Sequence, residues 1–269
     1  GVYGQRQQGV QMIRIKIPFG RLNTRQLRKI ADISDEYSNG NVHLTTRQDI
    51  QLHHVSLDRT PELWAKLEQD DITLREACGN TVRNVTASAE SGIDPKEAFD
   101  VSDYAYAVFN YFLRKPFCQE LGRKVKIAFS NSEEDTAYTF IHDIGFIPKL
   151  NSDGGKGFKV LIGGGLGAQP FLAQSAHEFL PAEEILTFIE GTLRVFDRHG
   201  ERTSRHKARM KYLIQKIGID AFKELVVSES AAIIPVRVED YFPEVLETTE
   251  IKSFDSKSKV IDTDAYQEW

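Results

Sequence analysis

Hydrophobic and polar residues largely alternate over residues 10–17, and this period of two predicts a β-strand. Ile13, Ile15 and Ile17 lie on its apolar face, and Arg14 and Lys16 lie on the opposite face. Pro18 follows immediately and favours an end to the strand. The pattern therefore predicts a half-buried strand that carries two basic side chains on its polar face.

The next elements alternate between helix and strand. An apolar stripe of Leu27, Ile30, Ala31 and Ile33 predicts a helix over residues 24–37, with Thr24 as its N-cap. Residues 42–55 are expected to form one strand, with Val42, Leu44, Ile50 and Leu52 on one face and His43, Thr45, Arg47, Gln51 and His53 on the other. Pro61 opens a short helix that ends near Glu68. This order indicates half of a small α+β sandwich, whose exposed sheet edge needs a partner half or a second copy of the chain.

The remainder of the chain indicates a second α/β unit. Strands are predicted at 123–129, 137–141 and 158–162, with a short strand or loop at 80–86. Helices are predicted at 102–114, 182–196, 203–217 and 220–227, the third capped by Thr203. Residues 231–269 are acidic and loop-like, and we expect them to form a linker.

The composition fits a globular protein of one or two domains. The chain has 269 residues, of which 41% are hydrophobic and 27% charged, and no apolar run is long enough to predict a transmembrane helix. It begins at Gly1 rather than Met and has no signal pattern, so we expect it to be part of a longer sequence.

The two cysteines limit the chemistry that this chain can supply. Cys78 and Cys118 have 39 residues between them, which excludes a C-x-x-C motif, a zinc pattern and a four-cysteine iron–sulfur site from this chain alone. His53 and His54 are adjacent on a predicted strand, so no metal ligand set is expected there. The low cysteine content favours a reducing, cytoplasmic location.

Charge is unevenly distributed and suggests an anionic ligand. Residues 1–60 carry nine Lys or Arg against five Asp or Glu, whereas residues 229–269 carry four against ten. The overall net charge of −5 argues against a general nucleic-acid binder. Basic residues also recur on predicted strands or strand-like runs: Arg14 and Lys16, His43 and Arg47, Arg83, and Lys124 and Lys126. Each polar face alone is compatible with simple solvation, but together they indicate a shared anion site.

A glycine run follows the strand predicted at 158–162. Gly163, Gly165 and Ala168 satisfy the loose dinucleotide fingerprint G-x-G-x-x-A, but no clear helix opens on the last glycine of the run, Gly167. The run indicates either a loop that lets a ligand approach the backbone or a turn that needs positive φ. Arg205 and Arg209 are expected to share one face of the following helix, and solvation is the usual reason for such a face.

Seven motifs in a fixed order resemble the siroheme-dependent sulfite and nitrite reductases. They lie within Tyr3–Gly9, Met12–Pro18, Leu44–His53, Ala77–Val85, Arg123–Lys126, Ile162–Gly167 and Arg202–Tyr212. The resemblance implies an α+β fold in which residues 1–70 are a ferredoxin-like half-domain and residues 75–230 are the first of two siroheme and iron–sulfur-type α/β domains. Residues 231–269 then resemble the linker to a second half.

The resemblance also implies roles for particular residues. Arg14, Arg83, Lys124 and Lys126 match the catalytic cations that surround the substrate anion. His43, Thr45, Arg47, Gln51, His53, Gly164, Gly165 and Arg209 match residues that contact siroheme. The Lys-x-Lys pair at 124 and 126 favours sulfite over nitrite, because nitrite reductases commonly have Asn at the second position.

The chain departs from the family pattern in one respect, since it lacks the four cysteines that bind the 4Fe-4S cluster. We therefore expect the N-terminal half of an assimilatory-type sulfite reductase, inactive alone in six-electron reduction of sulfite to sulfide. The implied partners are sulfite or nitrite, the C-terminal half, and an electron donor such as ferredoxin or a flavoprotein. A nitrite reductase half and a non-catalytic siroheme-binding module are the alternatives. A homodimer that covers the open sheet edge is a further expectation.

Overall fold

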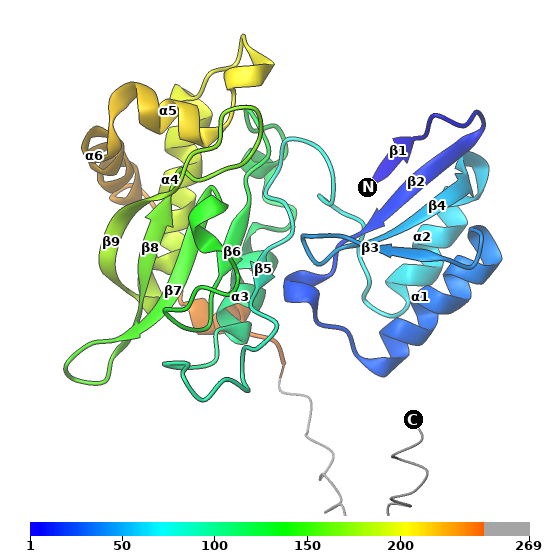
Figure 1. Cartoon of the computed structure of the whole chain (residues 1–269), viewed down its shortest axis with the longest axis horizontal. Helices are drawn as coiled ribbons and strands as arrows, with labels where there is room; N and C mark the ends of the chain where they lie inside the picture. The colour runs from blue at the N-terminus through cyan, green and yellow to red at the C-terminus, as the bar shows by residue number, and fades with distance from the viewer. Residues whose placement is uncertain (245–269) are drawn as a thin grey trace, which may run out of the picture.

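The computed structural model describes residues 1–244 of the chain. These residues form two α+β units that lie side by side, each built around its own sheet (Figure 1). Each unit also has its own cluster of buried hydrophobic side chains. Among the described residues, no helix has the length and apolar character needed to cross a membrane. The α+β class expected from the sequence is therefore confirmed.

The first unit is a four-stranded antiparallel sheet with two helices. Its strands are β1 (Val2–Gly4), β2 (Val10–Ile15), β3 (Val42–Leu44) and β4 (Ile50–Ser56), in the spatial order β1-β2-β4-β3. Helices α1 (Thr24–Tyr37) and α2 (Thr60–Glu68) pack on one face of this sheet. Ile13, Ile15 and Leu52 are completely buried on that face. The alternation of β2 therefore directs its isoleucines to the core and Arg14 away from it.

Helix α1 spans the predicted residues but has a different cap and a different buried stripe. Its N-cap is Asn23, whose side chain accepts a hydrogen bond from the Gln26 N–H at 2.8 Å, so the expectation for Thr24 was wrong. The buried residues of the helix are Ile30, Ile33, Ser34 and Tyr37, whereas Leu27 and Ala31 are exposed. Ile33, Ser34 and Tyr37 follow Ile30 by three, four and seven positions, which is the spacing of one helix face, and this face packs on the sheet.

The strand predicted at 42–55 is in fact a hairpin. Strands β3 and β4 pair in antiparallel register, with His43 opposite Gln51 and Leu44 opposite Ile50. They are joined by a turn in which the Thr45 N–H donates to the Asp49 carbonyl oxygen at 2.9 Å. Directly opposed residues point to the same face of a sheet, so His43 and Gln51 still share a face although the single strand was wrong.

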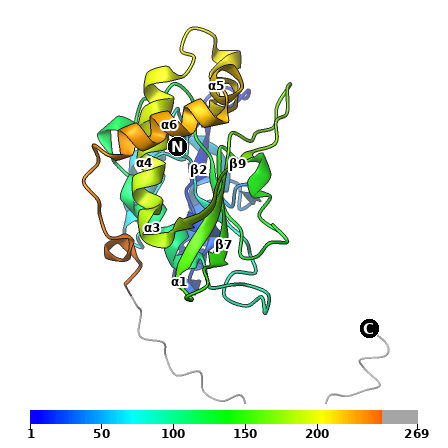
Figure 2. The same ribbon diagram turned by 90° about the vertical axis from the view of Figure 1, so that its left-hand side faces the viewer.

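The second unit contains a five-stranded mixed sheet with helices on one side (Figure 2). The strands are β5 (Thr86–Ala87), β6 (Ile127–Phe129), β7 (Ile144–Leu150), β8 (Lys156–Ile162) and β9 (Gln174–Pro181), adjacent in that order. The helices are α3 (Ser102–Phe112), α4 (Ile185–His199), α5 (Met210–Ile217) and α6 (Ile219–Ser230). Strands β5 to β7 run parallel, and β8 and β9 continue the sheet in antiparallel register.

In the second unit one predicted strand was wrong, one was too long, and two strands were missed. Residues 137–141 form a left-handed turn at Tyr138 and a 3-10 helix over Thr139–Ile141 rather than a strand. The hydrophobicity pattern missed β7, because its first five residues are all buried and show no alternation. It also missed β9, whose register against β8 is irregular. The strand predicted at 123–129 is limited to β6 and a single bridge between Val82 and Val125.

The helix predicted at 203–217 begins later than expected. The Glu201 side chain, not that of Thr203, accepts hydrogen bonds from the backbone N–H groups of residues 203 and 204. A 3-10 helix over Arg205–Lys207 follows, and α5 begins only at Met210. Arg209 is extended at the N-cap of α5, so Arg205 and Arg209 do not share a helix face.

The described part of the predicted linker packs against α3. Val238 is completely buried, the Tyr241 ring lies 5.0 Å from the Tyr111 ring, and the Phe242 ring lies 5.2 Å from the Tyr104 ring. Aromatic side chains thus pack Tyr241 and Phe242 against the second unit, and Val238–Tyr241 form a 3-10 helix rather than a loop. The linker role of residues 231–269 stays a prediction. Residues 245–269 lie outside the described residues.

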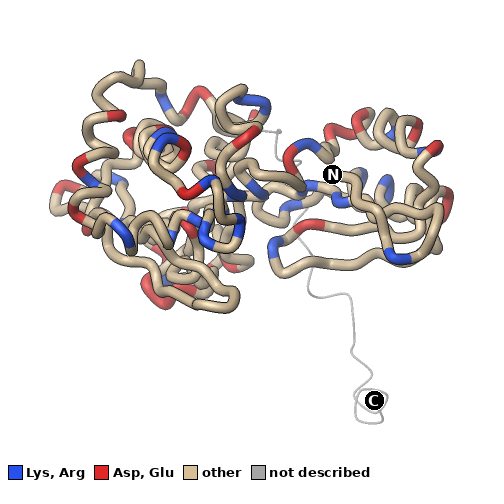
Figure 3. Tube along the Cα trace, turned by 90° about the horizontal axis from the view of Figure 1, so that it is seen from above, with Lys and Arg blue, Asp and Glu red and all other residues tan. Residues whose placement is uncertain are grey.

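Side-chain hydrogen bonds to the backbone join the two units. The Gln48 amide nitrogen donates to the Ala87 carbonyl oxygen at 2.7 Å, and its oxygen accepts from the Ala87 N–H at 3.1 Å. The fully buried Asn84 donates to the carbonyl oxygens of Ile17 at 2.6 Å and of Arg47 at 2.9 Å. These contacts fix the polar face of the first sheet against the second unit, where Lys and Arg segments gather (Figure 3).

Candidate functional site

A row of polar residues crosses the first sheet on the face opposite its helices. Arg14 on β2 pairs with Gln51 on β4, and Gln51 pairs with His43 on β3. With its amide oriented so that the oxygen faces Arg14, Gln51 accepts from Nε at 2.9 Å and from Nη2 at 2.8 Å. Because Gln51 is buried, this two-point contact fixes the direction of the Arg14 guanidinium.

Arg14 and Arg83, from the two different units, donate to the same backbone oxygen. The Ala77 carbonyl oxygen accepts from Arg14 Nη1 at 3.3 Å and from Arg83 Nη1 at 3.1 Å. Arg83 Nε also donates to the Gly79 carbonyl oxygen at 3.0 Å. Two cations that share one acceptor repel each other, and an anion bound between them would offset that repulsion. We call Arg14 and Arg83 the arginine pair.

Lys124 and Lys126 lie in the positive field of neighbouring arginines. Burial, and then the charges of Arg83 and Arg123, lower the pKa of Lys124. Burial, and then the charges of Arg47 and Arg209, lower the pKa of Lys126 to about 8. Within residues 1–244, no ion pair to a carboxylate is formed by the arginine pair or by either lysine. The structure therefore brings the four predicted substrate cations to one region, and none of them forms an ion pair with a carboxylate of the described residues.

Arg47 extends from the β3–β4 turn into the second unit. Its Nη2 donates to the carbonyl oxygen of Ile127 at 3.2 Å and to that of Asn84. Its Nε and Nη1 are buried and have no hydrogen-bond partner among the described residues. Burial lowers the pKa of Arg47 to about 10, so the side chain remains a cation at neutral pH. The two unmet guanidinium donors lie on either side of Nη2, so each suits a separate oxyanion or carboxylate oxygen.

Arg209 is held by a buried carboxylate. Arg209 Nη2 lies 2.8 Å from both oxygens of Asp143, and Nε lies 3.2 Å from Oδ1. Asp143 is completely buried, and its Oδ2 also accepts from the Lys126 backbone N–H at 2.9 Å. One acid therefore fixes two of the predicted site residues.

The predicted glycines allow the backbone to approach this region closely. A Cβ at Gly165 would lie 3.0 Å from Arg209 Nη2, and a Cβ at Gly164 would lie 2.5 Å from the Phe140 carbonyl oxygen. Gly165 continues into a bridge with Phe171, and no helix follows the run as a dinucleotide loop requires.

The remaining predicted residues lie at the edge of the site. The rings of His43 and His53 stack with centroids 6.0 Å apart, and burial lowers the pKa of His53, which favours its neutral form. The Thr45 hydroxyl accepts from the backbone N–H groups of Arg47 at 3.3 Å and Asp49 at 3.0 Å. Thr45 also lines a cavity of about 710 Å³ at the junction, but none of the four predicted substrate cations lines it.

Sequence reasoning assigned no role to four residues that shape this region, which are Asp49, His142, Asp143 and Lys211. Burial raises the pKa of Asp49 to about 6, and burial beside Arg47 lowers the pKa of His142 to about 3. Lys16 was counted among the strand cations that indicate a shared anion site, but its burial against Glu76 was not predicted. No sequence pattern pointed to Asp49 or Asp143, because the importance of a single acid in a loop depends on contacts with residues that are distant in the sequence.

The donor set fits carboxylate and oxyanion ligands but does not fit an iron–sulfur cluster. Unmet donors of Arg47 and the unpaired cations around Ala77 suit the acidic side chains of siroheme and a small oxyanion. The chain has two cysteines, Cys78 and Cys118, so it cannot supply the four thiolates of a 4Fe-4S cluster. Within residues 1–244, no three His, Cys, Asp or Glu side chains gather as a metal site.

The fold and the site define an α+β protein with a cluster of basic side chains where its two units meet. The sequence model described as the nitrite and sulphite reductase 4Fe-4S domain matches residues 78–233. The model of the nitrite/sulfite reductase ferredoxin-like half domain matches residues 3–70. The chain therefore belongs to the nitrite and sulphite reductase family, and the resemblance found in the sequence is confirmed.

Curated relatives carry both substrate names. A protein of Mycobacterium tuberculosis named sulfite reductase (ferredoxin) is 30% identical over 246 residues, which cover 85% of this chain and 44% of that protein. A protein of Haloferax mediterranei named assimilatory ferredoxin-dependent nitrite reductase is 32% identical, over 85% of this chain and 42% of that protein. The chain thus spans less than half the length of these relatives.

Solved structures share the same arrangement. The structure titled as the NirA protein of Mycobacterium tuberculosis matches with a TM-score of 0.81 and 30% identity, over 88% of this chain and 46% of that one. A dissimilatory sulfite reductase I matches with a TM-score of 0.69 at 12% identity, over 96% of this chain and 78% of that one. The second likeness concerns the fold alone.

Proposed function

We propose that this chain supplies the substrate-binding cations and part of the siroheme-binding surface of an assimilatory-type sulfite reductase, which reduces sulfite to sulfide with six electrons. The observation that carries the proposal is the gathering of Arg14, Arg83, Lys124 and Lys126 without neutralising carboxylates in residues 1–244. Fixed and unpaired cations bind a small dianion strongly, because the anion offsets their desolvation and mutual repulsion.

The four cations would divide the work between binding and proton supply. The arginine pair stays charged and orients the oxygens of sulfite. The three oxygens of sulfite must leave as water, and each needs two protons to do so. Lys126, with its pKa lowered to about 8, is still protonated at neutral pH but releases a proton more readily than an ordinary lysine. Lys124 has the same tendency, since burial and Arg83 lower its pKa.

Siroheme would be held by the outer part of the same region. Arg47 offers two buried and unmet donors to carboxylate oxygens, and Arg209 presents a guanidinium oriented by Asp143. Gln51, Thr45, His43 and His53 would complete the contacts of the first unit, and Gly164 and Gly165 leave room for the macrocycle. When bound, siroheme supplies the redox-active iron that accepts sulfite and delivers electrons to it.

The two cysteines of this chain are too few to bind a 4Fe-4S cluster. The chain spans 44% of the sulfite reductase relative, so we propose that the cluster ligands belong to a C-terminal half outside these 269 residues. Electrons would come from ferredoxin, after which both relatives are named, or from a flavoprotein. The free cysteines suit a reducing compartment, and we propose the cytoplasm.

A titration of the purified chain with siroheme, followed by sulfite, tests the proposal. We expect a siroheme spectrum that sulfite perturbs, and no appreciable sulfide from dithionite until the cysteine-bearing half is added. Failure of the chain to bind siroheme, or appreciable sulfide from the chain alone, would contradict this assignment. Arg83→Ala should abolish the sulfite effect and retain siroheme, since Arg83 belongs to the arginine pair.

Nitrite reduction to ammonia is the second candidate, and the nitrite reductase relative supports it. Lys126 separates the two candidates, because a second lysine offers one more positive charge to a dianion than the monoanion nitrite requires. Rates on both substrates, measured with the completed enzyme, decide between them. A third candidate, a siroheme-binding module without turnover, predicts no activity even after the cysteine-bearing half is supplied.

A further inference from the structure

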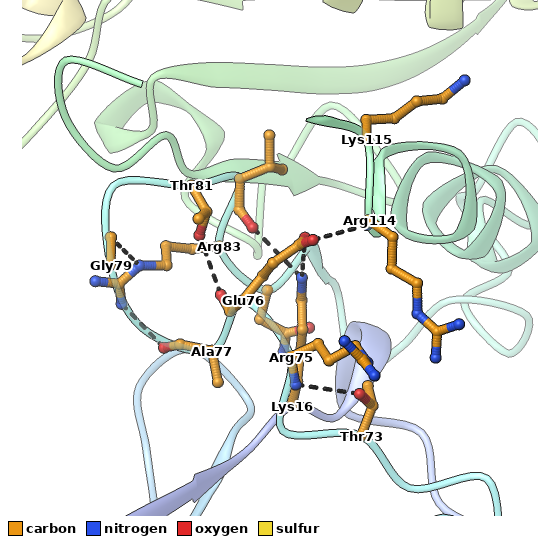
Figure 4. A network of polar contacts seen from close by, with 12 residues as sticks. Lys16, Thr73, Arg75, Glu76, Ala77, Gly79, Thr81, Arg83, Arg114 and Lys115 are labelled. Carbon is orange, nitrogen blue, oxygen red and sulfur yellow. Dashed lines mark hydrogen bonds and ion pairs between the residues drawn. The ribbon is translucent and has the colours of Figure 1, made fainter. Parts of the chain in front are cut away.

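The segment of residues 73–83 wraps around a buried lysine of the first unit. The Lys16 backbone N–H donates to the Thr73 carbonyl oxygen at 2.9 Å, and Lys16 Nζ donates to the Val82 carbonyl oxygen at 3.4 Å. Lys16 therefore touches both ends of the segment that carries Ala77 and Arg83 (Figure 4). Its side chain is 2% exposed, and Nζ lies 5.2 Å from the centre of the Phe109 ring on α3.

Glu76 is the charged partner of Lys16 in the middle of this segment. Its Oε2 lies 3.7 Å from Lys16 Nζ, and its side chain is 5% exposed. Its Oε1 accepts from the Arg114 backbone N–H at 2.7 Å and from Gln119 Nε2 at 2.8 Å. Glu76 thus ties the segment to the first unit on one side and to the residues that follow α3 on the other, as Figure 4 shows for Lys16 and Arg114.

The backbone of Glu76 is strained in a way that needs such ties. Its φ of 56° lies in the left-handed region, which costs a residue with a Cβ on the order of 1 kcal/mol and persists only where surrounding contacts impose it. The Thr81 hydroxyl supports the same turn by donating to the carbonyl oxygens of Glu76 at 3.3 Å and Cys78 at 3.2 Å. The strained turn sets the direction of the next carbonyl group, that of Ala77.

We propose that Lys16 and Glu76 are positioning residues that hold the Ala77 carbonyl oxygen in place and thereby set the spacing of the arginine pair for a small oxyanion. Arg14 and Arg83 come from different units, and the oxygen they share belongs to the residue after Glu76. Lys16 and Glu76 do not touch the anion. The use of the site for sulfite rests on the proposed function, whereas the fixing of the arginines does not.

Guanidinium NMR spectra of the purified full-length chain provide a direct test without any ligand. They report how fast each arginine side chain rotates, and Arg14→Lys and Arg83→Lys variants assign the two signals. In Glu76→Gln, we expect the rotation of Arg14 and Arg83 to become about tenfold faster, because loss of a buried ion pair frees the turn. The signal of Arg209, which Asp143 holds, should remain unchanged and serves as an internal reference.

Two further variants keep the test decisive. Glu36→Gln removes the carboxylate of an exposed ion pair with Lys66 on the same unit and should leave all three arginine signals unchanged. If Glu76→Gln does not fold, the double variant Lys16→Met with Glu76→Gln leaves no unpaired buried charge and should show the same faster rotation. Unchanged rotation of the arginine pair in either folded variant would overturn the positioning role.

Ligand binding then separates this inference from the proposed function. In the siroheme-loaded chain, Glu76→Gln should weaken sulfite binding about tenfold and leave siroheme affinity unchanged, because Arg47 and Arg209 are held by other contacts. If the wild-type chain binds neither siroheme nor sulfite, the proposed function fails while the NMR result still decides the positioning role. Equal weakening of siroheme and sulfite would instead indicate a general structural role and would contradict the inference.

Discussion

Replacement of Asp143 by asparagine tests the link between the stability of the second unit and the order of the site. Asp143 is completely buried and accepts hydrogen bonds from Arg209 and from the Lys126 N–H. Asparagine has nearly the same shape and can still accept from the Lys126 N–H. It has no charge, however, so the Arg209 guanidinium would remain as an unpaired cation.

The size of the effect follows from the burial of the two partners. The side chains of Arg209 and Asp143 are only 13% and 1% exposed, so water cannot replace the lost carboxylate. Removing one partner of a buried ion pair costs about 3–5 kcal/mol. For a protein of this size each kcal/mol lowers the melting temperature by about 2–4 °C, so the expected decrease is roughly 6–20 °C.

Urea and thermal unfolding of the wild-type chain and of Asp143→Asn measure this effect. Glu36→Gln, which removes an exposed ion pair, is the matched control and should melt with the wild type. Siroheme affinity should also fall in Asp143→Asn, since Arg209 loses its orientation. A folded Asp143→Asn whose stability lies within about 1 kcal/mol of the wild type would refute the argument from burial.

Other predictions concern protonation, close packing and assembly. Because Lys126 is charged only below its pKa of about 8, sulfite affinity should be highest below pH 8 and fall above it, and binding titrations of Lys126→Met should lose this step. Burial raises the pKa of Asp49 from 3.8 to about 6, so between these pH values the folded state binds more protons than the unfolded state. The free energy of unfolding should therefore decrease by about 3 kcal/mol as the pH rises from 3.8 to 6. Urea unfolding measures this decrease, which should be absent in Asp49→Asn. In Gly165→Ala the new Cβ would press on Arg209, so siroheme titrations should show weaker binding while a melting curve shows a folded chain. The open edge at β3 predicts a dimer in light scattering at high concentration, and a strictly monomeric mass would contradict that expectation.

The local pattern of the sequence was sufficient where one face of an element is buried and the other is not. The isoleucines of β2 and the limits of α1 could be read from periodicity, because their opposite faces meet core and solvent. The same reasoning failed for β7, which is buried along most of its length, and for the β3–β4 turn, which periodicity does not reveal. The start of α5 was misplaced because Glu201, rather than the expected Thr203, caps the preceding turn.

The sequence by itself determined the α+β class, the family, and the supply of basic residues. It could do so because periodicity is local and the motifs are contiguous. Only the tertiary structure decided which of these cations face one another. The Ala77 carbonyl oxygen joins Arg14 to Arg83 across 69 positions, and Asp143 joins Arg209 to Lys126. Burial decides these partnerships. Where packing excludes water, the hydrogen bonds and charge interactions of a buried group become strong, even when its partner is distant in the sequence. A local sequence pattern contains no information about such distant partners.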